Sequence, residues 1–257
     1  MKLTFLGSGS AFTVGEDNFH SNMLLEDNSN RLLIDCGSDA RLSLQAQGFC
    51  HRDINDVYIS HLHADHAGGL EWLAFTTKFD RIQPSRKPVL HISDLLVDRL
   101  WNNVLSGGLQ SIKGTVAELS TYFTVDPIGK ENSFLWSTIE VHLVQTEHIF
   151  SGKDLVPSYG LFFTASGLTC FITTDTQFKP DKHMPYYQKA DIIFHDCETT
   201  KKPSGVHPHY SQLITLDADI KAKMWLYHYN PGVLPDAKKD GFRGFIKKGQ
   251  SFDLSKK

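Results

Sequence analysis

The chain has 257 residues, of which 40% are hydrophobic and 21% are charged, and this is the composition of an ordinary globular protein. The formal net charge of -3 gives no sign of the basic stripe with which proteins bind long nucleic acid. A small anionic ligand is still compatible with this charge, because a bound metal would supply local positive charge. No run of about 18 apolar residues is present, so we expect no membrane partner.

The first part of the chain alternates short apolar runs with turn residues. Its periodicity predicts strands at 2–6, 22–26, 31–35 and 57–60 and helices at 38–47, 69–77 and 93–105. The first apolar run is broken at once by Gly7-Ser8-Gly9-Ser10, which leaves too short a hydrophobic region for a signal peptide. We therefore expect a cytoplasmic protein.

From about residue 116 the sequence becomes strand-rich and then alternates strands with helices. The pattern predicts strands at 139–145, 159–164, 169–174, 191–194 and 224–227 and helices near 181–189 and 211–214. No linker or repeat divides the chain, so one domain over residues 1–257 is expected. Two strand-rich halves with interspersed helices predict an α+β protein, an αββα sandwich.

The segment Ser60-His61-Leu62-His63-Ala64-Asp65-His66-Ala67-Gly68-Gly69 concentrates three imidazoles and a carboxylate at a predicted strand-to-helix turn. His61 and His63 point to the same side of an extended stretch, and the following turn brings Asp65 and His66 around the same point. The two glycines permit the tight backbone that such crowding needs. Nitrogen and oxygen donors packed this densely suit zinc, or manganese or iron in a mixed site.

This pattern, His-x-His-x-Asp-His at residues 61–66, resembles the signature motif of the metallo-β-lactamase superfamily. Residues 4–11 (TFLGSGSA) and 33–37 (LIDCG) resemble an opening strand and a buried strand end of its ribonuclease Z-like branch. The resemblance implies three later ligands: a third histidine at His148, a bridging carboxylate at Asp175 and a final histidine at His228.

The resemblance also implies how the ligands divide between two metal ions, taken as Zn²⁺ with Mn²⁺ or Fe²⁺ as alternatives. One ion is expected to be held by His61, His63 and His148. The other is expected to be held by Asp65, His66 and His228, with Asp175 between them. Two such cations lower the pKa of a shared water and clamp a phosphoryl oxygen, which is the chemistry of a hydrolase.

The stretch Gly205-Val206-His207-Pro208-His209-Tyr210 resembles the region where this branch places a histidine beside the scissile phosphate. Either His207 or His209 is a candidate to assist departure of the leaving group, and His207 is preferred. With Asp65 they form the expected catalytic set. Carboxylates that could orient the metal-binding imidazoles are also available, surface positions being the alternative: Glu147, Asp196 and Glu198. Aromatic side chains that could stack on a base are Phe19, Phe150 and Tyr159.

The tRNA-processing enzymes of this branch carry a long Gly/Pro-rich arm between the third histidine and the bridging aspartate. Here the interval from His148 to Asp175 is too short for such an arm, which makes tRNA a poor candidate and long nucleic acid an unexpected partner. Three stretches resemble anti-Pycsar-type phosphodiesterases, which open cyclic mononucleotides such as cyclic CMP and cyclic UMP: residues 18–22 (NFHSN), 158–161 (SYGL) and 173–178 (TTDTQF).

The expected function is therefore metal-dependent hydrolysis of a small anionic cyclic phosphodiester, such as a cyclic mononucleotide of the cCMP/cUMP/cAMP/cGMP class. The alternatives are a ribonuclease Z-like endo- or exonuclease acting on RNA or DNA ends and a lactonase-type metallohydrolase. Homodimers are frequent in this branch, so a homodimer is a candidate assembly. Residues 78–109 are a candidate cap or dimer contact.

Overall fold

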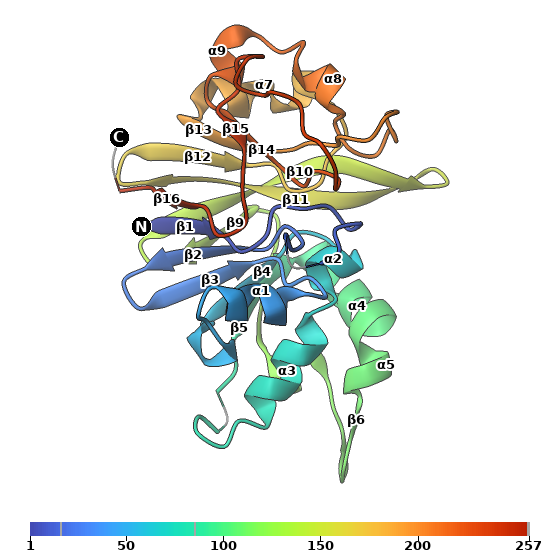
Figure 1. Ribbon diagram of the computed structural model, residues 1–257. Coiled ribbons are helices and arrows are strands. Elements are labelled where there is room, and N and C mark those ends of the chain that lie inside the picture. Colours follow the sequence, from blue (N-terminus) through green and yellow to red (C-terminus); the bar gives the residue numbers. More distant parts are fainter. Residues whose placement is uncertain (16, 85, 256–257) are drawn as a thin grey trace.

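The computed structural model describes residues 1–15, 17–84 and 86–255 and shows two β-sheets packed face to face between two layers of helices (Figure 1). This arrangement confirms the predicted α+β class and the αββα sandwich. Within the described residues, no helix has the length and apolar character needed to cross a lipid bilayer.

The first sheet has the strand order β16-β1-β2-β3-β4-β5-β8. Its strands are β1 (Lys2–Phe5), β2 (Met23–Asp27), β3 (Asn30–Ile34), β4 (Asp56–Ile59), β5 (Val89–Ser93), β8 (Thr124–Ile128) and β16 (Ser251–Asp253). The pairs from β3 to β8 are parallel, so each needs a crossover connection. Helices in these crossovers cover the outer face of the sheet (Figure 1): α1 (Ala40–Ala46), α3 (Leu70–Lys78), α4 (Asp94–Leu100), α5 (Ser106–Leu109) and α6 (Leu119–Tyr122).

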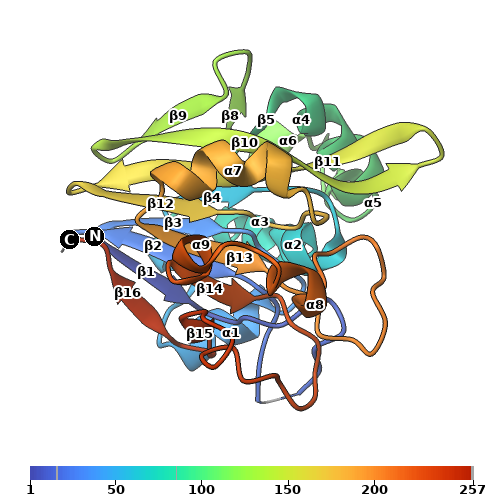
Figure 2. The same ribbon diagram turned by 90° about the horizontal axis from the view of Figure 1, so that it is seen from above.

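The second sheet has the order β15-β14-β13-β12-β11-β10-β9. Its strands are β9 (Ser133–Trp136), β10 (Ile139–Ser151), β11 (Asp154–Ala165), β12 (Leu168–Ile172), β13 (Ile192–Asp196), β14 (Met224–Tyr227) and β15 (Gly244–Phe245). The strands from β12 to β15 are parallel. The helices of this half lie over its outer face, as seen from above in Figure 2: α7 (Pro180–Lys189), α8 (Tyr210–Leu213) and α9 (Ala218–Lys221).

Aromatic side chains join the two sheets across the central core. The ring of Phe5 in β1 lies 5.2 Å from that of Phe194 in β13 and 5.3 Å from that of Tyr227 in β14, measured between centroids. The buried hydroxyl of Tyr58 donates a hydrogen bond of 2.7 Å to the carbonyl oxygen of Tyr159 in β11. These contacts fix the strand ends of one sheet relative to those of the other.

The structure changes three expectations about individual elements. The strand predicted at 139–145 continues to Ser151, so His148 lies inside β10 rather than after it. The helix predicted at 93–105 begins with α4 and continues as a π-helical segment, Trp101–Leu105. Residues 78–109 do not form a cap as a whole, because they contain β5, an inner strand of the first sheet.

The remaining elements are short. They comprise the 3-10 turn His51–Asp53, helix α2 (Ala64–Ala67) and a small hairpin of β6 (Ser111–Ile112) and β7 (Thr115–Val116). Of these, α2 matters most for function, because it lies within the predicted metal-binding motif.

Candidate metal centre

The carboxyl ends of strands from both sheets meet at one edge of the sandwich, where they bring the predicted ligands together. From the first sheet, β4 leads into the segment 60–63 and α2 follows it. From the second sheet, β12 leads to Asp175 and β14 ends directly before His228, while His148 lies at a β-bulge of β10. All seven predicted ligands belong to two groups of converging donor atoms: His61, His63, His148 and Asp175, and Asp65, His66, Asp175 and His228.

In the first group, three imidazoles surround one carboxylate oxygen. The Nδ1 atom of His63 lies 3.0 Å from Nε2 of His61 and 3.2 Å from Nε2 of His148. The Oδ2 atom of Asp175 lies 3.7 Å from the same nitrogen of His61 and 3.6 Å from that of His148. Ring nitrogens that converge in this way on a carboxylate oxygen can enclose a divalent cation.

In the second group, two imidazoles face two carboxylates. The Nε2 atom of His66 lies 3.3 Å from Oδ2 of Asp65 and 3.3 Å from Oδ1 of Asp175. The Nε2 atom of His228 lies 3.3 Å and 3.5 Å from the same two oxygens. Asp175 thus directs Oδ2 to the first group and Oδ1 to the second.

Unsatisfied buried atoms show that these residues fit a metal. Nε2 of His66 and Oδ1 of Asp175 are buried, and neither makes a well-aligned hydrogen bond within the described residues. Leaving a buried polar atom unpaired costs about 1–3 kcal/mol, so native proteins rarely do so without a reason. Coordination of a divalent cation by these nitrogen and oxygen donors supplies that reason.

The electrostatics of the two groups differ. Burial lowers the pKa of His61 well below its ordinary value and that of His148 to about 4, which leaves both imidazoles neutral, as metal ligands must be. Burial also acts to lower the pKa of His66 and His228, but neighbouring carboxylates, Asp175 first, outweigh it. The pKa of His66 is therefore well above its ordinary value and that of His228 rises to about 10. The carboxylates of the second group therefore favour a positive charge among them, which a metal cation would provide.

Hydrogen bonds from outside the two groups orient several ligand rings. Asp35, directly after β3, has its Oδ2 atom 2.7 Å from Nδ1 of His66, and its Oδ1 atom accepts a 2.8 Å hydrogen bond from the backbone N–H of Ser60. The hydroxyl of Ser60 lies 3.0 Å from Nδ1 of His61. Such contacts fix the ring orientation and the tautomer of a metal ligand. Neither Asp35 nor Ser60 was predicted to orient a ligand, although an aspartate directly after a buried strand was a usable signal in the sequence.

Of the three carboxylates considered for this orienting role, only Asp196 contacts the ligand rings. It is buried at the end of β13, with Oδ1 3.3 Å from Nδ1 of His228 and Oδ2 2.8 Å from Nδ1 of His207. Glu147 instead pairs with two lysines at the start of α7. Glu198 accepts hydrogen bonds from residues of its own loop.

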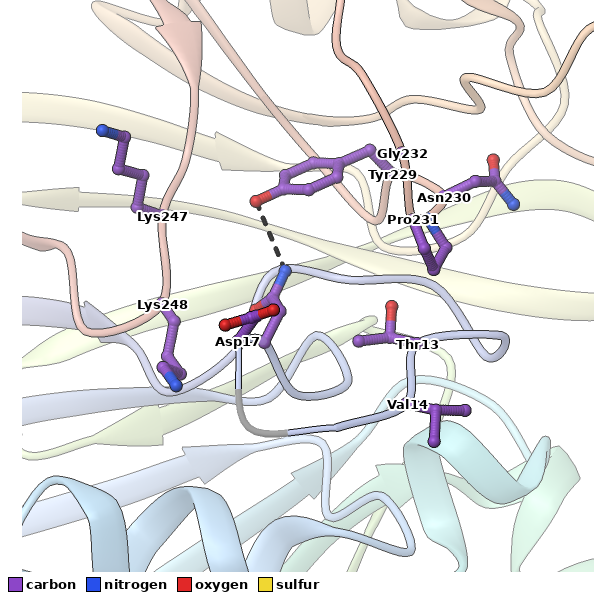
Figure 3. Close-up of a pocket in the computed structure, with 10 residues that line it drawn as sticks. Thr13, Val14, Asp17, Tyr229, Asn230, Pro231, Gly232, Lys247 and Lys248 are labelled. Atoms are coloured by element: carbon purple, nitrogen blue, oxygen red, sulfur yellow. Dashed lines mark hydrogen bonds between the residues drawn. The ribbon is translucent and has the colours of Figure 1, made fainter.

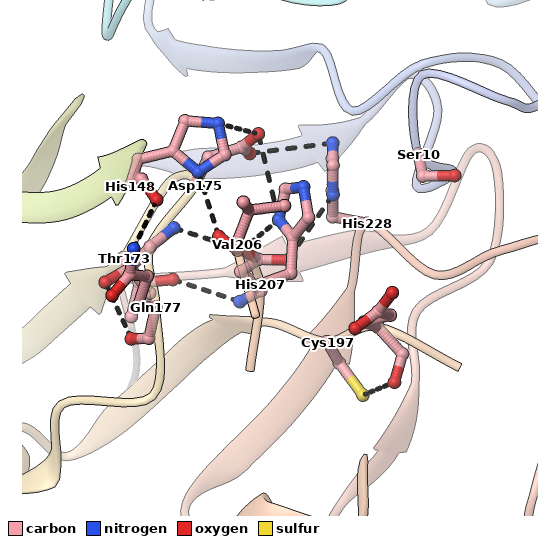
Figure 4. Close-up of polar contacts among 12 residues, drawn as sticks. Ser10, His148, Thr173, Asp175, Gln177, Cys197, Val206, His207 and His228 are labelled. Atoms are coloured by element: carbon pink, nitrogen blue, oxygen red, sulfur yellow. Dashed lines mark hydrogen bonds and ion pairs between the residues drawn. The ribbon is translucent and has the colours of Figure 1, made fainter. Parts of the chain in front are cut away.

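The structure brings His207 to the donor groups and places His209 elsewhere. Figure 4 shows the side chains from the second half of the chain that face one another here: His148, Asp175, His207 and His228. The ring of His207 lies 4.8 Å from that of His228, and Asp196 raises its pKa against the opposing effect of burial. His209 instead begins helix α8, with Nδ1 2.7 Å from the hydroxyl of Ser211 and Nε2 2.9 Å from the carbonyl of Thr200.

A cavity of about 420 Å³ opens over the donors, and His207 lines it whereas His209 does not. This volume lies in the range of small-molecule sites. Another cavity, of about 510 Å³, lies beside the β1–β2 loop and is lined by Lys247 and Lys248 (Figure 3). None of the residues that line this second cavity belongs to the donor groups, so the chemistry belongs to the first.

Backbone strain is concentrated beside the ligands. Asp35, Thr174 and His228 have positive φ angles of 62°, 51° and 61°, in the left-handed region that non-glycine residues rarely adopt. Each follows a strand that ends at the site. Such conformations persist where the surrounding structure over-determines them, which is typical of functional sites.

Comparison with known proteins agrees with this geometry. Residues 1–252 match the family model described as "Anti-Pycsar protein Apyc1". A protein of that name from Paenibacillus harenae is 38% identical over 234 residues, which covers 89% of this chain and 90% of the relative. Another, from Bacillus phage 010DV004, is 33% identical over 266 residues and covers 99% of this chain and 98% of the relative.

Solved structures show the same fold at low sequence identity. The metallo-β-lactamase fold protein YhfI from Bacillus subtilis superposes with a TM-score of 0.75 at 18% identity, covering 98% of each chain. The short form of human tRNase Z superposes with a TM-score of 0.72 at 18% identity, covering 99% of each chain. The chain therefore has the metallo-β-lactamase fold.

Proposed function

Because the chain belongs to the Anti-Pycsar protein Apyc1 family and is a metal-dependent hydrolase of the phosphodiesterase type, we propose that it hydrolyses a small cyclic phosphodiester, specifically a cyclic mononucleotide. We propose Zn²⁺ at both donor groups, with Mn²⁺ or Fe²⁺ as alternatives. The proposal rests mainly on the position of Asp175. One of its carboxylate oxygens faces the first group of donors and the other faces the second, and both groups lie beneath one cavity.

Two bound ions would supply a water that is nucleophilic at neutral pH and would neutralise charge on the phosphoryl oxygens. The chain's own contribution begins with orientation. The Oδ2 atom of Asp35 lies 2.7 Å from Nδ1 of His66, and Oδ1 of Asp196 lies 3.3 Å from Nδ1 of His228. In each ring the Nε2 atom faces the shared carboxylate Asp175. The ligands are thus held in place before substrate binds, and little reorganisation accompanies the reaction.

His207 is the residue we assign to the leaving group. Its Nδ1 atom is engaged by Asp196, which leaves Nε2 to hold the proton that is transferred. Asp196 raises the pKa of His207 against the effect of burial, which favours the protonated form of the ring. In the hydrolysis, the oxygen of water would form a bond to phosphorus as one ribose O–P bond breaks, and the proton of His207 would pass to the departing ribose oxygen. The attacking water would release a proton to solvent, from which His207 would be protonated again.

The segment between His148 and Asp175 is too short to carry an arm that could grip long nucleic acid. The segment from His148 to Asp175 consists of the end of β10, then β11 and β12, all within the second sheet. This favours a small substrate over a nuclease function. A cytoplasmic location, the single domain and the homodimer stay predictions, and light scattering of the purified protein tests the last of these.

The test is a substrate panel with the zinc-loaded protein. Initial rates are measured on cyclic CMP, cyclic UMP, cyclic AMP and cyclic GMP, on a single-stranded RNA oligonucleotide and on a lactone, with products identified by chromatography. We expect a nucleoside monophosphate from at least one cyclic nucleotide and far slower turnover of the other two classes. Faster cleavage of the oligonucleotide or of the lactone would contradict the proposal.

A further inference from the structure

The 420 Å³ cavity over the metal donors, called the metal cavity below, is lined by an aromatic ring that is not part of the hydrophobic core. Phe12, in the β1–β2 loop, lines this cavity and is 75% exposed. The ring therefore adds little to the hydrophobic core, and its contact with water is unfavourable until a ligand covers it. A lone exposed phenylalanine is common on protein surfaces, but this one lies beside the metal donors.

The backbone holds Phe12 in a fixed position. The N–H of Thr13 donates a 2.9 Å hydrogen bond to the carbonyl of Ser10, which closes a turn with Phe12 at its centre. The N–H of Ser10 donates in turn to the carbonyl of Tyr229, the residue directly after the last predicted ligand, at 3.1 Å. Gly9 permits this packing, since a Cβ atom there would lie 2.0 Å from the hydroxyl oxygen of Thr13. The ring is thus presented by a loop tied to the metal centre itself.

The rest of the cavity divides into two chemical parts. The metal donors form one part, which suits a phosphate. Ala11, Ile149 and Val206 add apolar lining to that of Phe12. Polar groups are contributed by Ser10, Ser204 and Asn230 and by the carboxylate of Glu198, which accepts hydrogen bonds from its own loop. A ligand with an anionic group at one end and a flat, apolar face at the other matches this division.

The aromatic side chains that the sequence pointed to are placed elsewhere. Tyr159 is buried in β11. Phe19 has the ammonium of Lys248 over its ring at 5.0 Å from the centroid, and Phe150 lies in the β10–β11 hairpin. None of the three lines the metal cavity. The position of Phe12 could not be inferred from the sequence, because it depends on a loop that folds back against the end of β14.

We propose that Phe12 is a stacking platform for the nucleobase of the substrate. The inference rests on the function proposed above and adds a specificity determinant to it. Stacking on an aromatic ring tolerates different bases, because every base has a π-face. Phe12 therefore selects phosphodiesters that carry an aromatic base without selecting strongly among the bases, whereas the metal donors act on the phosphate alone.

The test compares Phe12→Ala with the wild-type zinc enzyme on two substrates, cyclic AMP and the base-free ribose 3′,5′-cyclic phosphate. We expect Phe12→Ala to raise KM for cyclic AMP by about tenfold with little change in kcat, the magnitude of a lost base–aromatic stack. KM for the base-free compound stays unchanged. Phe12→Tyr restores KM, because it keeps the ring. Zinc content is measured for every variant and is expected to stay the same.

Val14→Ala is the matched control. Val14 lies in the same loop and is 91% exposed, but it lines the other cavity, so its removal leaves both KM values unchanged. If wild type hydrolyses cyclic AMP and Phe12→Ala leaves KM unaltered, or raises KM equally for the base-free compound, the platform is refuted and the proposed function stands. If the wild-type protein hydrolyses no cyclic nucleotide, the proposed function is contradicted, and the proposed role of Phe12 is contradicted with it.

Discussion

A single side chain, Asp175, serves both groups of donors. Its two oxygens lie 3.3 to 3.7 Å from imidazole nitrogens of His61, His66, His148 and His228, and it is almost fully buried. Burial alone would raise the pKa of this carboxyl, but His228 and His66 hold it well below its ordinary value. Asp175 therefore favours the negatively charged form, and its removal would alter both donor groups at once.

We expect Asp175→Ala to lose bound metal and to reduce turnover by on the order of 100-fold or more, while circular dichroism shows the chain still folded at room temperature. Metal content is measured by atomic emission and activity by the release of nucleoside monophosphate. Asp154→Ala, at the exposed start of β11, is the control and keeps both. Full turnover in Asp175→Ala would contradict the assignment of the centre.

A second prediction distinguishes the roles of His207 and His209. We expect His207→Ala to keep its metal and lose about 100- to 10,000-fold in kcat, the range of a lost general acid. His209→Ala keeps its kcat and loses about 1 kcal/mol of unfolding free energy, because His209 caps α8. Paired kinetic and urea-unfolding measurements check both. The reverse pattern would move the acid role to His209.

At this scale, candidate ligands that follow a recognisable motif or end a strand could be predicted from the sequence. His61 to His66 lie in one segment, and Asp175 and His228 follow apolar strands, so the family pattern placed them. The roles of Asp35 and Ser60 depend on which ring each meets across the fold. That information lies in the pairing of β3 with β4 and not in local sequence.

At the scale of elements, the contact between the end of β3 and helix α2 sets the metal-binding turn. The N–H of Cys36 donates to the carbonyl of His66 at 2.7 Å. Next to it, a Cβ atom on Gly37 would lie 2.1 Å from the carbonyl oxygen of Asp65, a backbone atom that cannot move without α2. Glycine is therefore required there by the close approach of two backbones.

Gly37→Ala is accordingly expected to displace α2, weaken zinc binding by at least about tenfold and lower the melting temperature. Zinc affinity is measured by competition with a chromophoric chelator. Gly107→Ala is the control: it lies in helix α5 with open space around its Cβ position, where alanine is the better helix former. Unchanged zinc affinity in Gly37→Ala would show that the turn tolerates the shift.

Elements with a clean apolar pattern were predictable, and elements whose pattern is interrupted were not. The strand 224–227 was placed correctly at both ends. β8 contains Pro127, which is typical of an edge strand and weakens the strand signal, and β8 does lie at the sheet edge. The bulge in β10 at His148 gives no local signal, because it is defined by a shift of register against β11.

For the whole molecule, the metal centre joins the two sheets. His61, His63, Asp65 and His66 come from the first half of the sandwich, and His148, Asp175 and His228 come from the second. Each donor group takes members from both halves. Bound metal therefore resists separation of the layers in addition to its role in chemistry.

We expect removal of metal by a chelator to lower the melting temperature by about 5–10 °C, which corresponds to roughly 2.7 kcal/mol for a site at a hundredfold excess over its dissociation constant. Differential scanning calorimetry with and without added zinc measures the shift. A single cooperative transition in both states would support the predicted single domain. An unchanged melting temperature would mean that the ions do not link the layers.

The spread of the ligands along the chain also determines when the centre can assemble during synthesis. Neither donor group is complete until Asp175 has been made, and the second also waits for His228. A nascent polypeptide leaving the ribosome can therefore complete its donor groups only late, after most of both sheets has been translated. A chain that terminates anywhere before β14 lacks His228, so its second donor group is incomplete.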